Sequence, residues 1–155
     1  METTAENNNQ NLTQSKSFSY SFMVNKKPLQ LFDFLLYVNN WWVGFYHEII
    51  TGDSTKLNEE FSFMAGGDIH YSKFKLVELI ANQKIVWEVT DSNLSFLEET
   101  DEWTGTRMGF DLMEQDGITK ITFMHFGLVP QFECYGQCTS AWRQYLDKLV
   151  ERVKT

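Results

Sequence analysis

The chain has 155 residues, a length that predicts one compact domain rather than two. Hydrophobic residues make up 43% of it and charged residues 22%, which excludes a wholly disordered or a fibrous protein. The formal net charge of −8 repels phosphate groups, so we expect neither nucleic acid nor an anionic membrane surface as a partner.

The first part of the chain contains a polar tail and then two kinds of regular pattern. Residues 1–15 have almost no side chains to bury, so we expect a disordered tail there and a single domain over residues 16–155. Strict alternation from Ser17 to Val24 predicts a half-buried strand. Pro28 and the helical spacing of the leucines after it predict a short helix, followed by a second short helix or turn over Val38–Trp42.

The middle of the chain has the period of two that is typical of an antiparallel meander. Strands are predicted at Phe45–Ile50, Glu59–Met64, Ile69–Leu79, Lys84–Thr90, Thr104–Met113 and Ile118–Phe126. Residues 91–103 form one long irregular stretch, whose acidic side chains we expect to be the solvated surface of a lid.

The last segment, from Pro130 to Val153, has apolar residues at every third or fourth position and predicts an amphipathic helix of about six turns. The order of elements predicts an α+β fold. In it, a curved antiparallel sheet of about seven strands wraps around the long C-terminal helix, and two short helices follow the first strand.

Several short motifs between Ser17 and about Val153 resemble one known family. They are Trp41-Trp42, the run from Glu102 to Thr106, the run from His125 to Pro130, the triplet Glu133-Cys134-Tyr135, and Ala141-Trp142. Together they resemble the single-domain form of the activator of heat-shock protein 90 ATPase homologue-like family, within the START-like (SRPBCC) superfamily.

The resemblance implies the helix-grip (START-like, Bet v 1-like) fold, with a cavity between sheet and helix that holds hydrophobic or aromatic ligands. Some branches of the superfamily are cyclase-like or hydrolase-like enzymes. The family name also suggests a chaperone and a stress response. The eukaryotic co-chaperone carries a separate N-terminal domain for which this chain has no room, so we expect no stimulation of a chaperone ATPase.

The aromatic content of 13 Phe, 6 Tyr and 5 Trp exceeds what a small core needs and indicates a lined cavity. Several of these rings fall at element ends, where they would meet the mouth of such a cavity. The predicted ligand-binding residues are Trp41, Trp42, Trp87, Trp103, Phe110, Phe123, His125, Tyr135, Cys138 and Trp142.

His125 is the candidate for chemistry, because it is in phase with Ile121 and Phe123 and should point inward. It is interpreted either as a core histidine with a hydrogen-bond partner or as a proton-transfer group. Arg107 and Asp111 alternate onto the opposite face and should lie on the surface, which weakens the catalytic interpretation.

Cys134 and Cys138 lie one helical turn apart and are interpreted as buried thiols. A metal site would need two more ligands at matching spacing, and the sequence contains no nucleotide-binding motif, so we expect neither metal nor cofactor. The low cysteine count and the lack of a long apolar run predict a cytoplasmic protein with no membrane segment.

Three functions therefore remain open from the sequence. The first is a binding protein for a small apolar or aromatic molecule. The second is an enzyme that uses His125, and the third is a module that contacts a chaperone.

Overall fold

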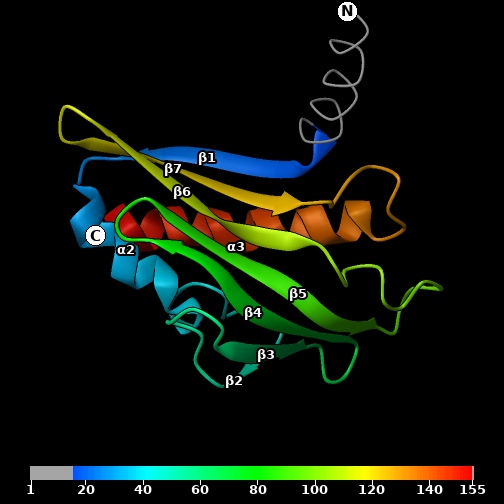
Figure 1. Cartoon of the computed structure of the whole chain (residues 1–155). Helices are drawn as coiled ribbons and strands as arrows, with labels where there is room; N and C mark the ends of the chain where they lie inside the picture. Colours follow the sequence, from blue (N-terminus) through cyan, green and yellow to red (C-terminus); the bar gives the residue numbers. More distant parts are fainter. Residues whose placement is uncertain (1–15, 155) are drawn as a thin grey trace, which may run out of the picture.

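A seven-stranded antiparallel sheet forms one layer of the molecule and the long helix α3 forms the other, in a computed structural model that describes residues 16–154 (Figure 1). The predicted tail at residues 1–15 lies outside the described residues. The strands are β1 (Phe18–Val24), β2 (Ile49–Thr51), β3 (Glu60–Ala65), β4 (His70–Ile80), β5 (Lys84–Leu94), β6 (Arg107–Gln115) and β7 (Ile118–Phe126). The helices are α2 (Pro28–Leu36), the 3₁₀ turn η1 (Val38–Asn40) and α3 (Tyr135–Lys154).

The sheet order is β1-β7-β6-β5-β4-β3-β2, so every strand after β1 lies beside its neighbour in sequence. β1 pairs instead with β7, in a register that joins Phe18 to His125 and Val24 to Thr119. The sheet curves around α3, and the predicted helix-grip fold is confirmed.

Four predicted elements had wrong boundaries. One of them is β6, which covers Arg107–Gln115 rather than Thr104–Met113. β2 covers Ile49–Thr51 rather than Phe45–Ile50, because the preceding residues form a loop around the Glu48 side chain. β5 continues to Leu94, and register shifts in its pairing with β4 accommodate the extra length. α3 begins at Tyr135 instead of near Pro130, because residues 129–135 form hydrogen-bonded turns.

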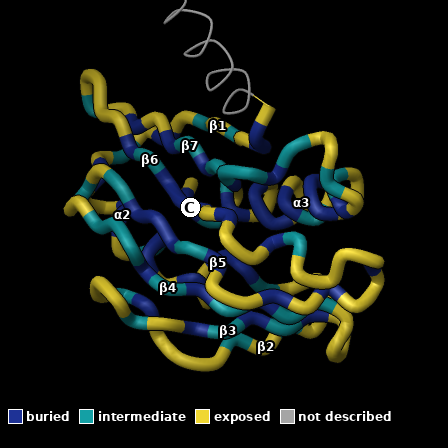
Figure 2. Tube along the Cα trace, turned by 45° about the vertical axis from the view of Figure 1, so that its right-hand side comes forward, coloured by how far each residue is buried: buried dark blue, intermediate teal, exposed yellow. Residues whose placement is uncertain are grey.

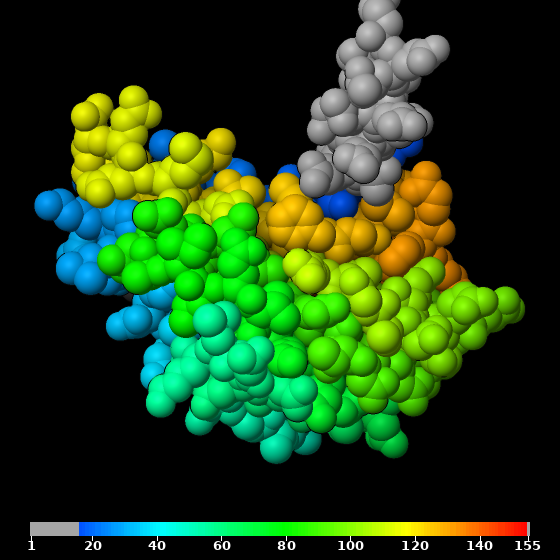
Figure 3. Space-filling view, viewed as in Figure 1, coloured from blue at the N-terminus to red at the C-terminus, as the bar shows by residue number. Residues whose placement is uncertain are grey.

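The hydrophobic core lies between the inner face of the sheet and α3. Figure 2 shows that buried residues follow the middle of the strands and run along α3. The apolar stripe of α3 is buried as predicted, through Cys138, Trp142, Tyr145, Leu146 and Leu149. In the space-filling view the sheet hides most of α3 (Figure 3).

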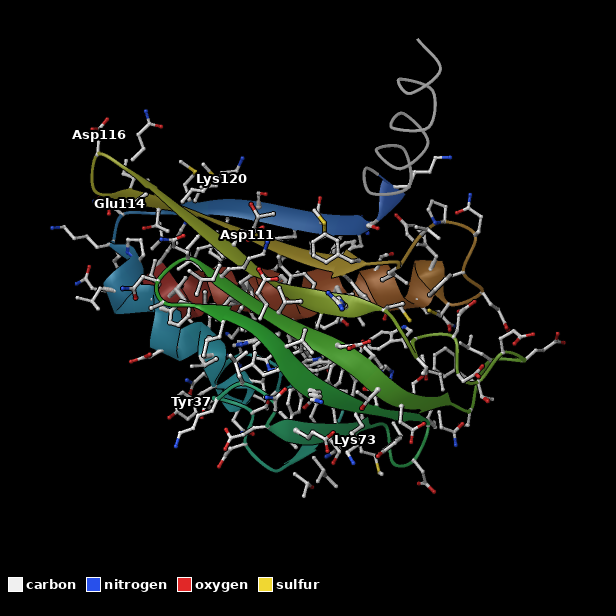
Figure 4. All side chains as sticks on the ribbon, in the orientation of Figure 1. Tyr37, Lys73, Asp111, Glu114, Asp116 and Lys120 are labelled. Carbon is white, nitrogen blue, oxygen red and sulfur yellow. The ribbon has the colours of Figure 1, made fainter. Side chains whose placement is uncertain are left out.

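The outer face of the sheet carries charged side chains. As predicted, Asp111 and Arg107 lie opposite the buried Met108 and Phe110. Figure 4 shows Asp111 on β6 and Lys120 on β7, with Glu114 and Asp116 near the turn between these strands. These charges therefore lie away from the core.

Gly109 permits the close approach of β5 and β6. A Cβ atom at this position would lie 2.0 Å from the carbonyl oxygen of Ile85. Any other residue would force the two strands apart, so glycine is required at this point of the curved sheet.

Candidate functional site

A pocket of about 300 Å³ opens between the inner face of the sheet and the first half of α3. The sheet contributes Phe63, Ala65 and His70, and α3 contributes five residues. Those from α3 are Gln137, Cys138, Ala141, Trp142 and Tyr145. Loops complete the wall with Tyr46, Ile69, Phe96 and Trp103, among others. No charged side chain is among the lining residues, so the wall is uncharged and mainly aromatic.

Stacked rings form one wall of the pocket. The ring of Trp42 stacks on Phe63 with centroids 3.8 Å apart and on Trp142 at 5.0 Å. Trp103 is nearly parallel to Trp142, at 5.9 Å and 8°. Trp42 reaches this position because η1 turns the chain, with the Trp42 amide donating to the Val38 carbonyl oxygen at 2.8 Å. The wall thus presents flat apolar faces.

The loop from Gly44 to Glu48 is attached to α3 at the rim of the pocket. The Glu48 carboxylate accepts backbone hydrogen bonds from Gly44, at 2.8 Å, and from Tyr46, at 2.9 Å. It also accepts the hydroxyl of Tyr145 from α3 at 2.6 Å. Burial raises the pKa of Glu48, but these hydrogen bonds outweigh it and the pKa is lowered overall. An ionised Glu48 therefore holds the rim in place.

The opposite rim is held by two reciprocal contacts between residues 98–103 and the start of α3. The Glu102 carboxylate accepts the amides of Glu133, at 2.8 Å, and Cys134, at 3.2 Å. The Glu133 carboxylate accepts the amide of Glu98 at 3.0 Å. The expectation of a merely solvated acidic surface was therefore wrong for Glu102, which sits where an anion stabilises a helix N-terminus.

His125 is fully buried, and both of its ring nitrogens are occupied. The indole N–H of Trp142 donates to Nδ1 at 3.1 Å, so Nδ1 is unprotonated. In the neutral ring Nε2 then carries the hydrogen and donates to Thr106 Oγ1 at 2.8 Å, and Thr106 donates to the Trp103 carbonyl oxygen at 2.6 Å. Burial, with a smaller effect of His70, lowers the pKa of His125 to about 3. The ring is neutral and fixes the orientation of Trp142.

His70 lies in the pocket wall on the other side of Trp103. Its ring is edge-on to Trp103 at 4.6 Å, and that of His125 is edge-on to the same indole at 4.7 Å. One nitrogen of His70, Nε2, lies 3.3 Å from the hydroxyl of the buried Ser72. Burial lowers the pKa of His70 to about 4, so this imidazole is neutral as well.

Trp103 and Cys138 meet where the loop covers α3. Within residues 16–154, Trp103 Nε1 is the one buried side-chain nitrogen or oxygen without a hydrogen-bond partner. The neighbouring thiol of Cys138 is only a weak acceptor. A hydrogen bond from Cys138 to Cys134, together with burial, raises the pKa of Cys138, so this thiol is uncharged. Both cysteines are buried and free of disulfides.

The structure places the ten predicted site residues in two groups. Trp42, Trp103, Cys138 and Trp142 line the pocket. The others lie outside its wall: Trp41, Trp87, Phe110, Phe123, His125 and Tyr135. Of these, Trp41 packs edge-on against Phe110 at 5.1 Å and donates its indole N–H to the Leu35 carbonyl oxygen. Trp87 packs against Phe61 and donates to Ser54.

Sequence reasoning missed most of the wall that the sheet and the loops contribute. The missed lining residues include Tyr46, Phe63, His70, Phe96, Ala141 and Tyr145. A signal existed for His70, which is in phase with the buried Ser72 and Phe74 and therefore belongs to the inner face of β4.

No protein-family model matches the sequence, and no curated protein matches it. Solved structures, in contrast, match the chain in fold. The Aha1 dimer from Colwellia psychrerythraea aligns with a TM-score of 0.67 at 19% identity, over 89% of this chain and 96% of the other. The chain has the START-like helix-grip fold. MLL2253 from Mesorhizobium loti aligns with a TM-score of 0.64 at 17% identity, over 88% and 96% of the two chains. CalU16 from Micromonospora echinospora aligns at 0.60 and 12%, over 88% and 75%.

Two further observations concern residues 16–154. None of the helices there combines the length and hydrophobicity that a membrane span requires. The same residues contain no group of three or more His, Cys, Asp or Glu side chains arranged to hold a metal ion.

Proposed function

We propose that this START-like domain is a cytoplasmic binding protein for a small apolar or aromatic molecule, held in the pocket between the sheet and α3. The observation that carries the proposal is the uncharged aromatic wall around about 300 Å³ of space. Ligand sites are typically apolar concavities of this size or larger, with few polar groups. The structural neighbours support the START-like fold, which commonly binds ligands.

The hydrogen bonds of His125 favour binding over catalysis by this residue. A general base needs a nitrogen within reach of the proton that it removes. Trp142 and Thr106 already occupy both nitrogens of His125, and the ring lies behind the pocket wall. His125 therefore acts as a positioning residue for Trp142 in this proposal.

No observation favours the chaperone-contact hypothesis. Among residues 16–154, the most exposed large hydrophobic side chains are Leu29 on α2, Met113 on β6 and Ile49 on β2, which belong to separate parts of the fold. A contiguous apolar patch is the usual mark of such a surface.

The test compares two variants that install the same ring on α3. Ala141 lines the pocket, so Ala141→Phe should fill it, whereas Ser140→Phe places the ring on an exposed position. Native mass spectrometry of freshly purified protein and quenching of tryptophan emission by aromatic compounds are the measurements. We expect Ala141→Phe to weaken binding at least tenfold and Ser140→Phe to leave it unchanged. Equal binding by both variants would refute the proposed site.

A further inference from the structure

The polar side chains of the pocket differ in whether they already have a hydrogen-bond partner, and this difference restricts which ligand can bind. Tyr145 already donates its hydroxyl to Glu48, and Tyr46 donates to Gln144. Gln137 is exposed at the mouth.

The wall also contains the indole N–H groups of Trp42 and Trp103 and the Cys138 thiol, which can donate a hydrogen bond but are weak acceptors or none. Trp103 Nε1 is itself buried, away from the pocket space. His70 is the lining side chain with an imidazole, held between two rings of the wall: it is edge-on to Phe63 at 5.4 Å and to Trp103 at 4.6 Å.

One nitrogen of His70 is without a partner. Nε2 is paired with Ser72, and no other residue between 16 and 154 hydrogen-bonds to this ring. Among those residues, Trp103 Nε1 is the only buried side-chain nitrogen or oxygen that lacks a partner, so the free Nδ1 of His70 still has accessible surface. Because His70 belongs to the pocket wall, that surface is available to a molecule in the pocket.

The charge of the wall excludes ionised ligands. The lining residues include neither a Lys or Arg to pair an anion nor an Asp or Glu to pair a cation. A charged group without a partner in such a site would lose its hydration without compensation. Burial keeps the His70 imidazole neutral, so it offers a hydrogen bond rather than a charge.

The volume limits the size of the ligand. A cavity of about 150 Å³ accommodates one benzene ring, so about 300 Å³ fits two fused rings. The flat faces of Trp42 and Trp142 suit a planar molecule.

Resting on the proposed function, we propose that the ligand is an uncharged two-ring aromatic molecule with one hydroxyl group, which hydrogen-bonds to Nδ1 of His70. A hydroxyl both donates and accepts, so it fits either neutral tautomer of the imidazole. His70 is then the specificity-determining residue of the pocket.

The experiment uses three probes of similar shape: 2-naphthol, 2-methylnaphthalene and 2-naphthoate. Their dissociation constants are measured by NMR titration of the full chain at neutral pH. We expect 2-naphthol to bind about fivefold tighter than 2-methylnaphthalene, as one net hydrogen bond provides. The anion 2-naphthoate should bind more weakly than either.

Two histidine variants test whether His70 causes the preference for 2-naphthol over 2-methylnaphthalene. His70→Phe keeps an aromatic ring but removes the free nitrogen, so it should bind 2-methylnaphthalene within about twofold of the wild type and lose the preference for 2-naphthol. His47→Asn is the matched control. His47 is exposed, lies outside the pocket wall and has a positive φ of 51° that asparagine tolerates, so the preference should remain.

A second readout does not depend on how the variants fold. In the wild type, 2-naphthol should shift the imidazole nitrogen resonances of His70, whereas 2-methylnaphthalene should leave them nearly unchanged. Equal affinity of the wild type for these two probes would overturn the role of His70 while leaving the binding pocket intact. Failure of all three probes to bind the folded wild type would overturn both the inference and the proposed function.

Discussion

Two inward-facing histidines flank the indole of Trp103, one on the β6–β7 side of the molecule and one on the β3–β4 side. His125 is enclosed, with both nitrogens hydrogen-bonded and no part in the pocket wall. His70 has the same edge-on contact with Trp103 and a similarly lowered pKa, but one nitrogen is unpaired. A lowered pKa therefore reflects burial of both histidines. Their hydrogen bonds distinguish the structural histidine, His125, from the one that is available to a ligand, His70.

Truncation of the ring that His125 orients should have the largest effect. Trp142 is 2% exposed, packs on Phe123 at 4.6 Å and donates to His125. We expect Trp142→Ala to lower the free energy of unfolding by about 3–5 kcal/mol, measured by urea denaturation. Trp142→Phe, which keeps an aromatic ring but loses the N–H donor and part of the ring volume, should cost clearly less. A loss below about 1 kcal/mol for the alanine variant would contradict tight packing on this side.

Loss of the histidines themselves should differ between the two regions. His125→Leu leaves the indole N–H of Trp142 buried without an acceptor, so we expect a loss of about 2 kcal/mol. His70→Leu removes a ring that already has an unpaired nitrogen, and its loss should be smaller. Unfolding by urea at pH 7.5 measures both. Equal losses would show that the two environments do not differ as described.

Acid should destabilise the protein through both histidines. Their folded-state pKa values, about 3 for His125 and about 4 for His70, lie below the ordinary value of 6.5, so the unfolded chain binds more protons between these limits. Stability is complete above pH 6.5 and falls as the pH drops through this window.

In this window each histidine should lower the free energy of unfolding by up to about 1.4 kcal/mol for each pH unit of acidification. Free energies of unfolding measured from pH 6 to pH 5 should therefore show a shallower slope in His125→Gln, by about that amount. The exposed His47 supplies the control, and an unchanged slope in His125→Gln would indicate that His125 is not held neutral.

The carboxylates that hold the loop near Trp103 should contribute less. Glu102 accepts two amides at the start of α3, so we expect Glu102→Gln to cost about 1 kcal/mol, in the range of helix-capping residues. Glu114 lies exposed at the far end of β6, and Glu114→Gln is the matched control with no expected effect. Thermal unfolding at pH 7 measures both, and similar midpoints would argue against the reciprocal contacts.

Removal of residues 1–15 should have the smallest effect. Their composition offers no apolar burial, so we expect the free energy of unfolding to change by less than about 0.5 kcal/mol. A clear drop in the melting temperature of the shortened chain would refute this expectation.

The fold was predictable because each element carries its own period. Alternation located four strands, β1, β3, β4 and β7, to within one residue at each end, whereas β5 and β6 end later than predicted. The stripe from Cys138 to Leu149 defined the inner face of α3. β2 was misplaced because its loop depends on a side chain, Glu48, that collects backbone amides from residues before it. Single-residue patterns do not encode such contacts.

The pocket was only partly predictable, because it is a volume that side chains leave empty. Phe110 and Phe123 alternate on the inner face just as Phe63 does, yet they pack against Trp41 and only Phe63 borders the pocket. Periodicity identifies the inner face, whereas the curvature of the sheet decides where α3 leaves space.

The pairing of β1 with β7 has a consequence for how the chain is made. Strands β2 to β7 join neighbours in sequence, so their contacts are local and form quickly. The contact between Ser21 and Thr122 spans 101 positions. During synthesis β1 therefore remains unpaired until β7 has left the ribosome, and its inner face remains uncovered until α3 has followed. The first strand of the chain is among the last to be covered, and this stage leaves the hydrophobic side of β1 open to wrong partners.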